Sequence, residues 1–328
     1  MKAIVRLKAG KEFSTMQVQE ISSHTLQSGE VKVRIASSRI NPVDMDLMKG
    51  FPTLKYKKPQ IGGIDGAGTI SEIGQNVRDF KVGDKVFFYR KFSDIGTWAE
   101  EINIHTDYIA KIPAHLTTEQ AGTIALPLLT AYDSLQQLGA KKGEKILIHG
   151  AGGGVGFLAV QIAKSMGLEV IGTASGKDID ELKNVGIDRV IDYRKEQFAN
   201  VLKKREVTYI FDLLGKDILL QSIDLQPKKI VSVHYVVPEK MNKAGVNLPV
   251  ILKWILSLTM TKFRKRAKRN GVELIGQVTG GNGQLLTEAS RIASEKMFVV
   301  REIPTVQLIE IEQKGLTKTD VGIAILFG

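Results

Sequence analysis

The chain has 328 residues, of which 43% are hydrophobic, and its formal net charge at pH 7 is +11. This length predicts two domains, and this hydrophobic content is sufficient for buried cores. The chain contains no cysteine, which excludes disulfides, thiolate zinc sites, iron–sulfur clusters and a cysteine nucleophile.

The first 122 residues are predicted to form a mostly β domain. Six glycines between residues 62 and 83 favour a small, tightly bent barrel. Arg39–Asp46 predicts a turn that leads into a short helix. Alternation of apolar and polar residues predicts strands over Met1–Leu7, Gln17–Ile21, Val31–Ser37, Thr97–Ile104 and Tyr108–Ile112.

The pattern changes after residue 117. Thr118–Gly139 is apolar at helical spacing, and Pro127 is expected to bend this helix or to divide it into two. Strands then alternate with helices, which predicts a parallel sheet covered on both faces. Helices are predicted over Lys177–Val185, Glu196–Lys204, Lys216–Ile223 and Leu285–Ser294, and strands over Arg189–Ile191, Tyr209–Leu214, Lys229–His234, Val272–Thr279, Val299–Arg301 and Val321–Phe327.

The sequence KILIHGAGGGVGFLAVQIAKSMGLEVIGTAS, residues 145–175, contains the strongest motif. An apolar strand, a glycine cluster over Gly150–Gly156, a helix and a second strand follow one another, as in a dinucleotide-binding βαβ unit. Ala151, Gly153 and Gly156 take the three glycine positions of the G-x-G-x-x-G fingerprint, and Ala151 is expected to make the tight turn. The backbone from Ala151 to Gly156, including Gly152, Gly154 and Val155, is therefore predicted to hold a pyrophosphate.

The end of the second strand indicates which dinucleotide binds. An enzyme that uses NAD usually has a carboxylate there, for the ribose 2′-hydroxyl. Here Thr173 and Ser175 end the strand, and the first carboxylate is Asp178. Ser175 can donate a hydrogen bond and Lys177 can supply positive charge to a 2′-phosphate, which favours NADPH. The alternative is that Lys177 is only a solvated residue at the start of a helix.

Six of the eight residues 262–269 are basic. A solvated helix is the expected structure, with nucleic-acid binding or attraction to a membrane surface as alternatives. The longest apolar stretch, Leu248–Met260, is too short to span a bilayer, and the first residues carry no signal-peptide pattern. A cytoplasmic location is therefore expected.

The chain resembles the medium-chain dehydrogenase/reductase superfamily, in its zinc-free, quinone oxidoreductase-like branch. The resemblance rests on INPVD (40–44), GGIDGAGTISEIGQNVRDFKVGDKVF (62–87), GTWAEE (96–101), LPLLTAYDSL (126–135), GAGGGVG (150–156) and GIDRVIDYRKE (186–196). It implies an α/β fold in which a GroES-like β-barrel-type domain, residues 1–122 and 281–328, is joined to a doubly wound Rossmann domain, residues 123–280. It also implies NADPH in the cleft, hydride transfer to a quinone or α,β-unsaturated carbonyl, and a homodimer paired through Val272–Thr279.

No metal is predicted. Zinc-dependent relatives have a His-Glu pair in the glycine-rich run where this chain has Ile64 and Asp65. The five histidines have no ligand spacing, and the chain has no cysteine to complete such a site. Conjugated acceptors need less polarisation than simple carbonyls, so positioning can replace a Lewis acid.

The remaining candidate residues are assigned by the resemblance or by strand ends, except Tyr56, which is a possible hydrogen-bond donor to a substrate oxygen in a loop without a motif. Asn41 and Tyr56 are candidate catalytic groups, although Asn41 is alternatively a turn residue before Pro42. The resemblance also implies cofactor contacts for Asn41, Thr130 and Tyr193. Further cofactor contacts are expected where strands end, at Leu213, Leu214, Gly215, Ser232 and Val233. The alternative function is a non-catalytic Rossmann protein that senses NADPH or binds nucleic acid.

Overall fold

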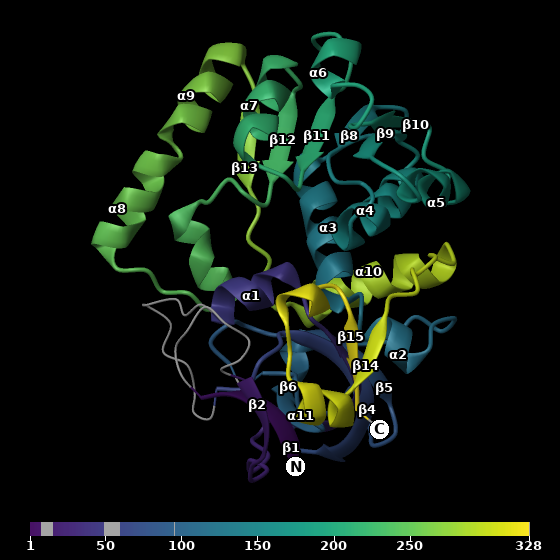
Figure 1. Ribbon diagram of the computed structural model, residues 1–328, viewed down its shortest axis with the longest axis vertical. Helices are drawn as coiled ribbons and strands as arrows, with labels where there is room; N and C mark the ends of the chain where they lie inside the picture. Colours follow the sequence, from purple (N-terminus) through teal and green to yellow (C-terminus); the bar gives the residue numbers. More distant parts are fainter. Residues whose placement is uncertain (8–15, 49–59, 95, 328) are drawn as a thin grey trace.

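The computed structural model describes residues 1–7, 16–48, 60–94 and 96–327. In Figure 1 a parallel sheet with its helices occupies one end of the molecule, and a mostly antiparallel sheet occupies the other, where the N-terminus also lies. This arrangement agrees with the α/β class and with the Rossmann-plus-GroES-like architecture expected from the sequence.

The parallel sheet has the strand order β10-β9-β8-β11-β12-β13 in the described residues, and every neighbouring pair is parallel. Its central strands are continuous apolar runs because helices cover both faces. The strands are β8 (Lys145–Ile148), β9 (Glu169–Ala174), β10 (Arg189–Asp192), β11 (Tyr209–Asp212), β12 (Lys229–Ser232) and β13 (Glu273–Gly276). The helices of this part are α3 (Ala125–Leu138), α4 (Gly154–Ser165), α5 (Asp178–Asn184), α6 (Phe198–Val201), α7 (Lys216–Asp224), η3 (Pro238–Ala244), α8 (Val250–Thr259) and α9 (Thr261–Asn270).

The N-terminal part is built around β3 (Glu30–Arg39), whose alternating burial gives it one core-facing side. The sheet has the order β14-β15-β3-β4-β5-β7, with β6 also paired to β3, while β1 and β2 form a separate ribbon. The other elements are β1 (Lys2–Arg6), β2 (Met16–Glu20), α1 (Pro42–Met48), β4 (Asp65–Ile73), β5 (Lys85–Tyr89), β6 (Glu101–His105), η2 (Thr106–Tyr108), β7 (Ile109–Lys111) and α2 (Thr118–Ala121).

The C-terminal segment returns to the N-terminal sheet. Strand β15 (Ala324–Leu326) pairs antiparallel with β3, so that Ala324 lies opposite Arg39. Before it come α10 (Gly283–Glu295), β14 (Thr305–Gln307), α11 (Leu308–Lys314) and η4 (Lys318–Asp320). The residue limits of the two domains stay a prediction.

Two expectations about elements were wrong in detail. The predicted strand Val299–Arg301 is irregular, because the Gln161 amide bonds both the N–H and the carbonyl of Val299, at 2.8 and 3.0 Å, in place of a strand ladder. The predicted helix Thr118–Gly139 is divided at residues 122–124 and not at Pro127. Pro127 lies in the first turn of α3, where a missing N–H costs no helical hydrogen bond.

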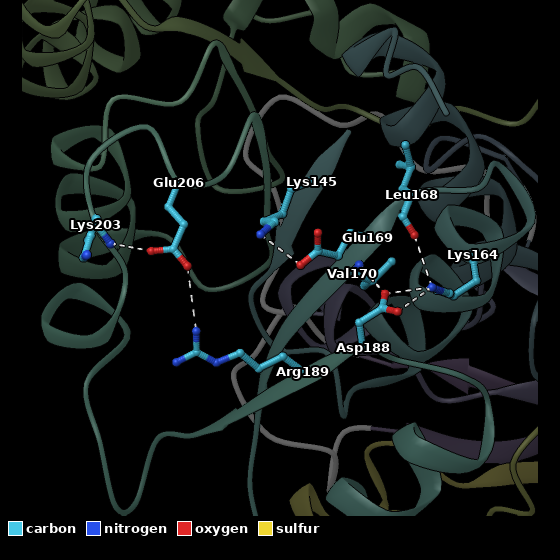
Figure 2. Close-up of polar contacts among 9 residues, drawn as sticks. All are labelled: Lys145, Lys164, Leu168, Glu169, Val170, Asp188, Arg189, Lys203 and Glu206. Carbon is cyan, nitrogen blue, oxygen red and sulfur yellow. Dashed lines mark hydrogen bonds and ion pairs between the residues drawn. The ribbon is translucent and has the colours of Figure 1, made fainter. Parts of the chain in front are cut away.

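Charged contacts join the amino ends of three neighbouring strands of the parallel sheet (Figure 2). Lys145 pairs with Glu169 across β8 and β9 at 2.9 Å, and the Asp188 carboxylate accepts a bond from the Val170 N–H at 2.7 Å. Lys164 of α4 bonds the same Asp188, also at 2.7 Å. These contacts fix the strand register at one end of the sheet, while the glycine-rich turn lies at the other.

Candidate functional site

A cavity of about 1100 Å³ lies where the carboxyl ends of the parallel strands face the N-terminal part. Its wall combines α1 and the end of β5 with the glycine turn and the ends of β9, β11 and β12. Clefts at this edge of a parallel sheet are the usual ligand sites of such folds. The predicted site residues in its wall are Asn41, Thr130, Gly152, Gly153, Gly154, Val155, Gly156, Thr173, Ser175, Tyr193, Leu213, Leu214 and Val233.

Four predicted cofactor residues are not in that wall: Ala151, Lys177, Gly215 and Ser232. Lys177 is exposed at the start of α5. Asp212, at the end of β11, accepts bonds from the Gly215 N–H at 3.0 Å and the Ser232 hydroxyl at 2.6 Å. Gly215 and Ser232 therefore hold the strand ends in place. Tyr56 lies outside the described residues.

The glycine turn differs from its predicted form by one residue. Gly150, with φ +67°, makes the tight turn that was assigned to Ala151. Ala151 is fully buried, and its N–H donates to the Thr173 carbonyl at 3.0 Å. Its methyl group occupies the space beside Gly172, where a Cβ would lie 2.7 Å away. The alanine is tolerated because the left-handed conformation falls on the preceding glycine.

The two other fingerprint glycines have different surroundings. A Cβ on Gly156 would overlap the Gly150 carbonyl oxygen and lie 2.7 Å from the Ala151 Cα, so the fold itself requires glycine there. A Cβ on Gly153 would meet only the Gly150 oxygen, at an ordinary 3.4 Å. Gly153 precedes the first turn of α4 and faces the cavity. Its bare backbone is thus free to approach a ligand at the start of the helix.

Polar and basic groups gather at the end of β9. The Ser175 hydroxyl donates to the Tyr193 hydroxyl at 2.8 Å, and both residues line the cavity. Arg194 was not predicted, but its guanidinium lies 3.9 Å from the place of a Cβ on Gly176. Its position directly after Tyr193 in the sequence was the available signal. Lys177 and Arg194 therefore place two exposed cations near Ser175.

The nearest carboxylate after β9 is already paired. Asp178 lies 3.4 Å from Arg301, which also pairs with Glu181 at 2.5 Å and donates to the Gly152 carbonyl. The Arg301 guanidinium also lies 4.1 Å above the Phe157 ring. Arg301 thus ties the C-terminal segment to the glycine turn, a contact between residues far apart in the sequence that no local pattern could reveal.

His149 is buried and structural. The Ser222 hydroxyl donates to the Ile218 carbonyl at 2.7 Å, so its oxygen accepts from His149 Nε2 at 2.9 Å. The ring also packs edge-on against Phe198. Burial lowers the pKa of His149 to about 4, with Asp212 opposing the shift. The imidazole is therefore neutral at pH 7.

Beneath Asn41 lies a pair of buried carboxyl groups that sequence reasoning did not identify as titratable. Asp65 accepts bonds from Asn41 Nδ2 at 2.8 Å and from the Leu126 N–H at 3.1 Å. Asp44 accepts from the Asn41 N–H at 2.7 Å. Burial raises the pKa of Asp65 to about 7, and burial together with Asp65 raises the pKa of Asp44 well above its usual range.

The same contacts orient Asn41 in the cavity wall. One amide hydrogen points to Asp65, and Nδ2 also lies 3.4 Å from the Arg39 carbonyl. The remaining polar atom is Oδ1, a hydrogen-bond acceptor. Asn41 is thus better suited to a ligand that donates a hydrogen bond, such as a carboxamide, than to one that needs a donor.

We expect the buried carboxyl pair to make stability depend on pH. Between pH 4 and pH 7 the folded protein retains a proton on Asp65 that the unfolded chain releases, because the pKa rises from 3.8 to about 7 on folding. The free energy of unfolding should therefore fall as pH rises, by about 1.4 kcal/mol per pH unit for the proton on Asp65 alone, and more steeply where Asp44 also retains its proton. Urea unfolding from pH 4.5 to 8 measures this slope.

The Asp44→Asn variant tests the origin of that slope. Its amide oxygen can still accept from the Asn41 N–H, while its side chain cannot ionise. We expect a shallower decline with pH and a more stable protein at pH 8, because burial raises the pKa of Asp44 as well. Parallel curves for the parent and the variant would contradict this assignment.

Within residues 1–7, 16–48, 60–94 and 96–327, no group of three His, Cys, Asp or Glu side chains could hold a metal ion. Ile64 and Asp65 are both buried, and Asp65 is occupied by the bonds described above. In the same part of the chain, no helix is long and apolar enough to cross a membrane.

Two protein-family models match the chain. One, described as an alcohol dehydrogenase GroES-like domain, covers residues 27–114, and the other, described as a zinc-binding dehydrogenase, covers residues 154–275. The quinone oxidoreductase of Mus musculus is 30% identical over 226 residues, which are 65% of this chain and 68% of that protein. The match spans less of other relatives, such as 54% of the 2-methylene-furan-3-one reductase of Solanum lycopersicum, which is 30% identical. It spans 61% of the human quinone oxidoreductase, which is 32% identical.

Solved structures resemble the whole chain. A quinone oxidoreductase from Coxiella burnetii has a TM-score of 0.79 and 27% identity, with coverage of 100% of this chain and 98% of that one. An Escherichia coli quinone oxidoreductase complexed with NADPH has a TM-score of 0.77, 24% identity and coverage of 99% and 100%. The second likeness shows a shared fold only.

Proposed function

This chain belongs to the medium-chain dehydrogenase/reductase superfamily, in its quinone oxidoreductase-like branch, and from that premise we propose a zinc-independent reductase of quinones or α,β-unsaturated carbonyls that uses NADPH. Its membership supports an NAD(P)-dependent oxidoreductase. One observation carries the finer proposal: a single cavity runs from Ser175, past the glycine turn, to Asn41. One end of the cavity therefore carries groups suited to binding a dinucleotide, and the other end is lined by residues of the N-terminal part.

The residues present fit NADPH. Gly153 and the N–H groups at the start of α4 would hold the pyrophosphate, while Ser175, Lys177 and Arg194 would surround the 2′-phosphate. The acceptor oxygen of Asn41 would receive the carboxamide N–H. When bound, the reduced nicotinamide supplies the hydride. The preference for NADPH over NADH is further supported at the end of β9. The first carboxylate there, Asp178, is paired with Arg301 and so is not free to accept a bond from the ribose 2′-hydroxyl of NADH.

The substrate end of the cavity supports a conjugated acceptor. Val43, Leu47 and Phe92 line it from the N-terminal part, and Met241 and Val246 line it from the segment around η3. Apolar walls can hold a flat ring or an enone beside the nicotinamide and exclude water. Zinc independence is supported by the sequence, which has no cysteine and has Ile64-Asp65 at the His-Glu position.

The test is to mix the protein with NADPH and a panel of quinones and enones, and to follow the absorbance of the reduced nicotinamide. We expect turnover of at least one conjugated acceptor and none of the matched saturated ketones. Turnover that survives exhaustive chelation supports zinc independence. No turnover across the panel would contradict the proposed activity, and loss of turnover on chelation would contradict its zinc-independent form.

We expect Lys177→Ala to weaken NADPH binding about tenfold and NADH binding much less, because one exposed cation near the 2′-phosphate is removed. Titration calorimetry with both dinucleotides measures the two dissociation constants. Lys183→Ala, at an exposed lysine later in α5, is the matched control and should change neither constant. Equal weakening of NADPH and NADH by Lys177→Ala would refute the assignment.

The proposal includes a cytoplasmic homodimer. Strand β13 is the edge strand of the parallel sheet in the described residues, so its outer side is available to a second copy, as predicted for Val272–Thr279. Light scattering at several concentrations tests it: a monomer at every concentration would rule out the dimer.

A further inference from the structure

Helix α8 presents an apolar face to solvent. Ile251, Trp254, Ile255 and Leu258 are 75%, 65%, 46% and 52% exposed, and their spacing of three and four residues places them on one face. The opposite face packs against the hydrophobic core through the partly buried side chains of Leu252 and Leu256. A patch of this kind with a tryptophan is unusual on a protein surface and marks an interaction site.

Helix α9 continues from α8 with positive charge. Met260 ends one helix and begins the next, and α9 is held by the buried side chains of Phe263 and Ala267. In Figure 1 the two helices lie end to end along one outer edge of the molecule. The basic residues of α9 are all exposed: Lys262, Arg264, Lys265, Arg266, Lys268 and Arg269.

The apolar and basic groups form one continuous strip. Within α9, Lys262, Lys265 and Arg269 follow one another by three and four residues, which is the spacing of one helical face, and this helix begins directly where α8 ends. The strip therefore passes from Ile251 to Leu258 as apolar side chains and then to Arg269 as cations. Two cations of α9 contact neighbouring elements: the Arg266 Nε lies 2.7 Å from the Asp224 carboxylate of α7, and Arg264 donates to the Ser257 hydroxyl of α8 at 3.0 Å.

We propose that α8 and α9 dock on the surface of a bilayer that contains anionic lipids, with the apolar face of α8 in the interface and the cations of α9 on the headgroups. An apolar face with a tryptophan, next to a cluster of lysine and arginine, has the chemistry of a helix that lies in the membrane plane. A second copy of the chain, which itself carries a net charge of +11, would supply little charge complementarity to the cations of α9. A nucleic acid would leave the apolar face uncovered.

The docked edge lies beside the proposed substrate end of the cavity. Met241 and Val246 line the cavity, and the chain passes from them directly into α8, which contacts η3. Docking would therefore place the lipid surface near the segment that borders the cavity. The membrane proposal itself does not depend on hydride transfer, and its test contains no activity measurement.

The test is sedimentation of the full chain with vesicles of phosphatidylcholine containing 30% phosphatidylglycerol, compared with vesicles of pure phosphatidylcholine. We expect binding to the anionic vesicles only, weakened by salt. The triple variant Lys262→Glu/Lys265→Glu/Arg269→Glu should weaken binding at least about a hundredfold, because the loss of each cation costs roughly fivefold and the new carboxylates are repelled by the anionic lipids as well. Ile251→Ser/Trp254→Ser should weaken it at least about tenfold. Circular dichroism and thermal midpoints establish that each variant is folded.

Matched controls carry the same changes elsewhere on the surface. Lys81→Glu/Lys203→Glu/Lys204→Glu makes the same change in net charge, and Val82→Ser/Ile309→Ser removes two other exposed apolar groups. Both should sediment like the parent. Equal binding to both vesicle types, equal loss in variants and controls, or no binding at low salt would overturn the proposal. A dimer that α8 substitutions dissociate, or RNA binding that competes with vesicles, would do so too.

Discussion

Gly153→Val should abolish tight binding of NADPH while it leaves the fold intact. The dissociation constant is expected to rise at least about a hundredfold, because two methyl groups would stand where the pyrophosphate must approach the backbone. The fold has room for the added Cβ, which meets only one atom at 3.4 Å, and Gly153, with φ −79° and ψ 170°, has a backbone that valine adopts readily. Calorimetry and thermal unfolding measure the two effects separately.

Gly156→Ala is the opposing control three residues away. Its single methyl would overlap the Gly150 carbonyl oxygen, so the backbone of the turn must shift. We expect a loss of about 1–3 kcal/mol in unfolding free energy without ligand. Together the two variants separate a glycine needed by the fold from one needed by the ligand. Normal NADPH affinity in Gly153→Val would show that the pyrophosphate does not lie against this turn.

Ser175→Asp should reverse the preference between the two dinucleotides. A carboxylate at the end of β9 would repel the 2′-phosphate and could accept bonds from a free ribose hydroxyl. We expect the dissociation constant for NADPH to rise about a hundredfold and that for NADH to stay equal or to fall. Lys177 and Arg194 nearby would stabilise the new carboxylate, so the substitution should not unfold the protein.

Ser175→Asn is the isosteric control, since it has the shape of aspartate without its charge. It should weaken NADPH binding much less than aspartate does. Both variants lose the bond from the Ser175 hydroxyl to Tyr193, so that loss cancels in the comparison. Equal effects of Asn and Asp would mean that shape, and not charge at this position, selects the dinucleotide.

Structural features that depend on neighbouring residues in the sequence were predicted well. The strands and helices of the βαβ unit and the parallel sheet followed from periodicity. Most residues predicted from the glycine turn and from the rule that ligands bind at strand ends lie in the cavity wall, although many other residues of that wall were not predicted. Errors occurred where a local signal had a long-range competitor. Val299–Arg301 has the residues of a strand, but the Gln161 side chain, 138 positions away, takes its hydrogen bonds.

By itself the sequence determined the absence of cysteine, the excess of positive charge, and the glycine-rich turn between two apolar strands, because these are properties of composition and of neighbouring residues. Only the tertiary structure decided that Gly150 makes the tight turn, that Asp44 and Asp65 share a buried site, and that α8 leaves an apolar face uncovered. Backbone angles, burial and pKa shifts depend on which distant segments meet. Such contacts are set by packing of the whole chain and leave no local pattern.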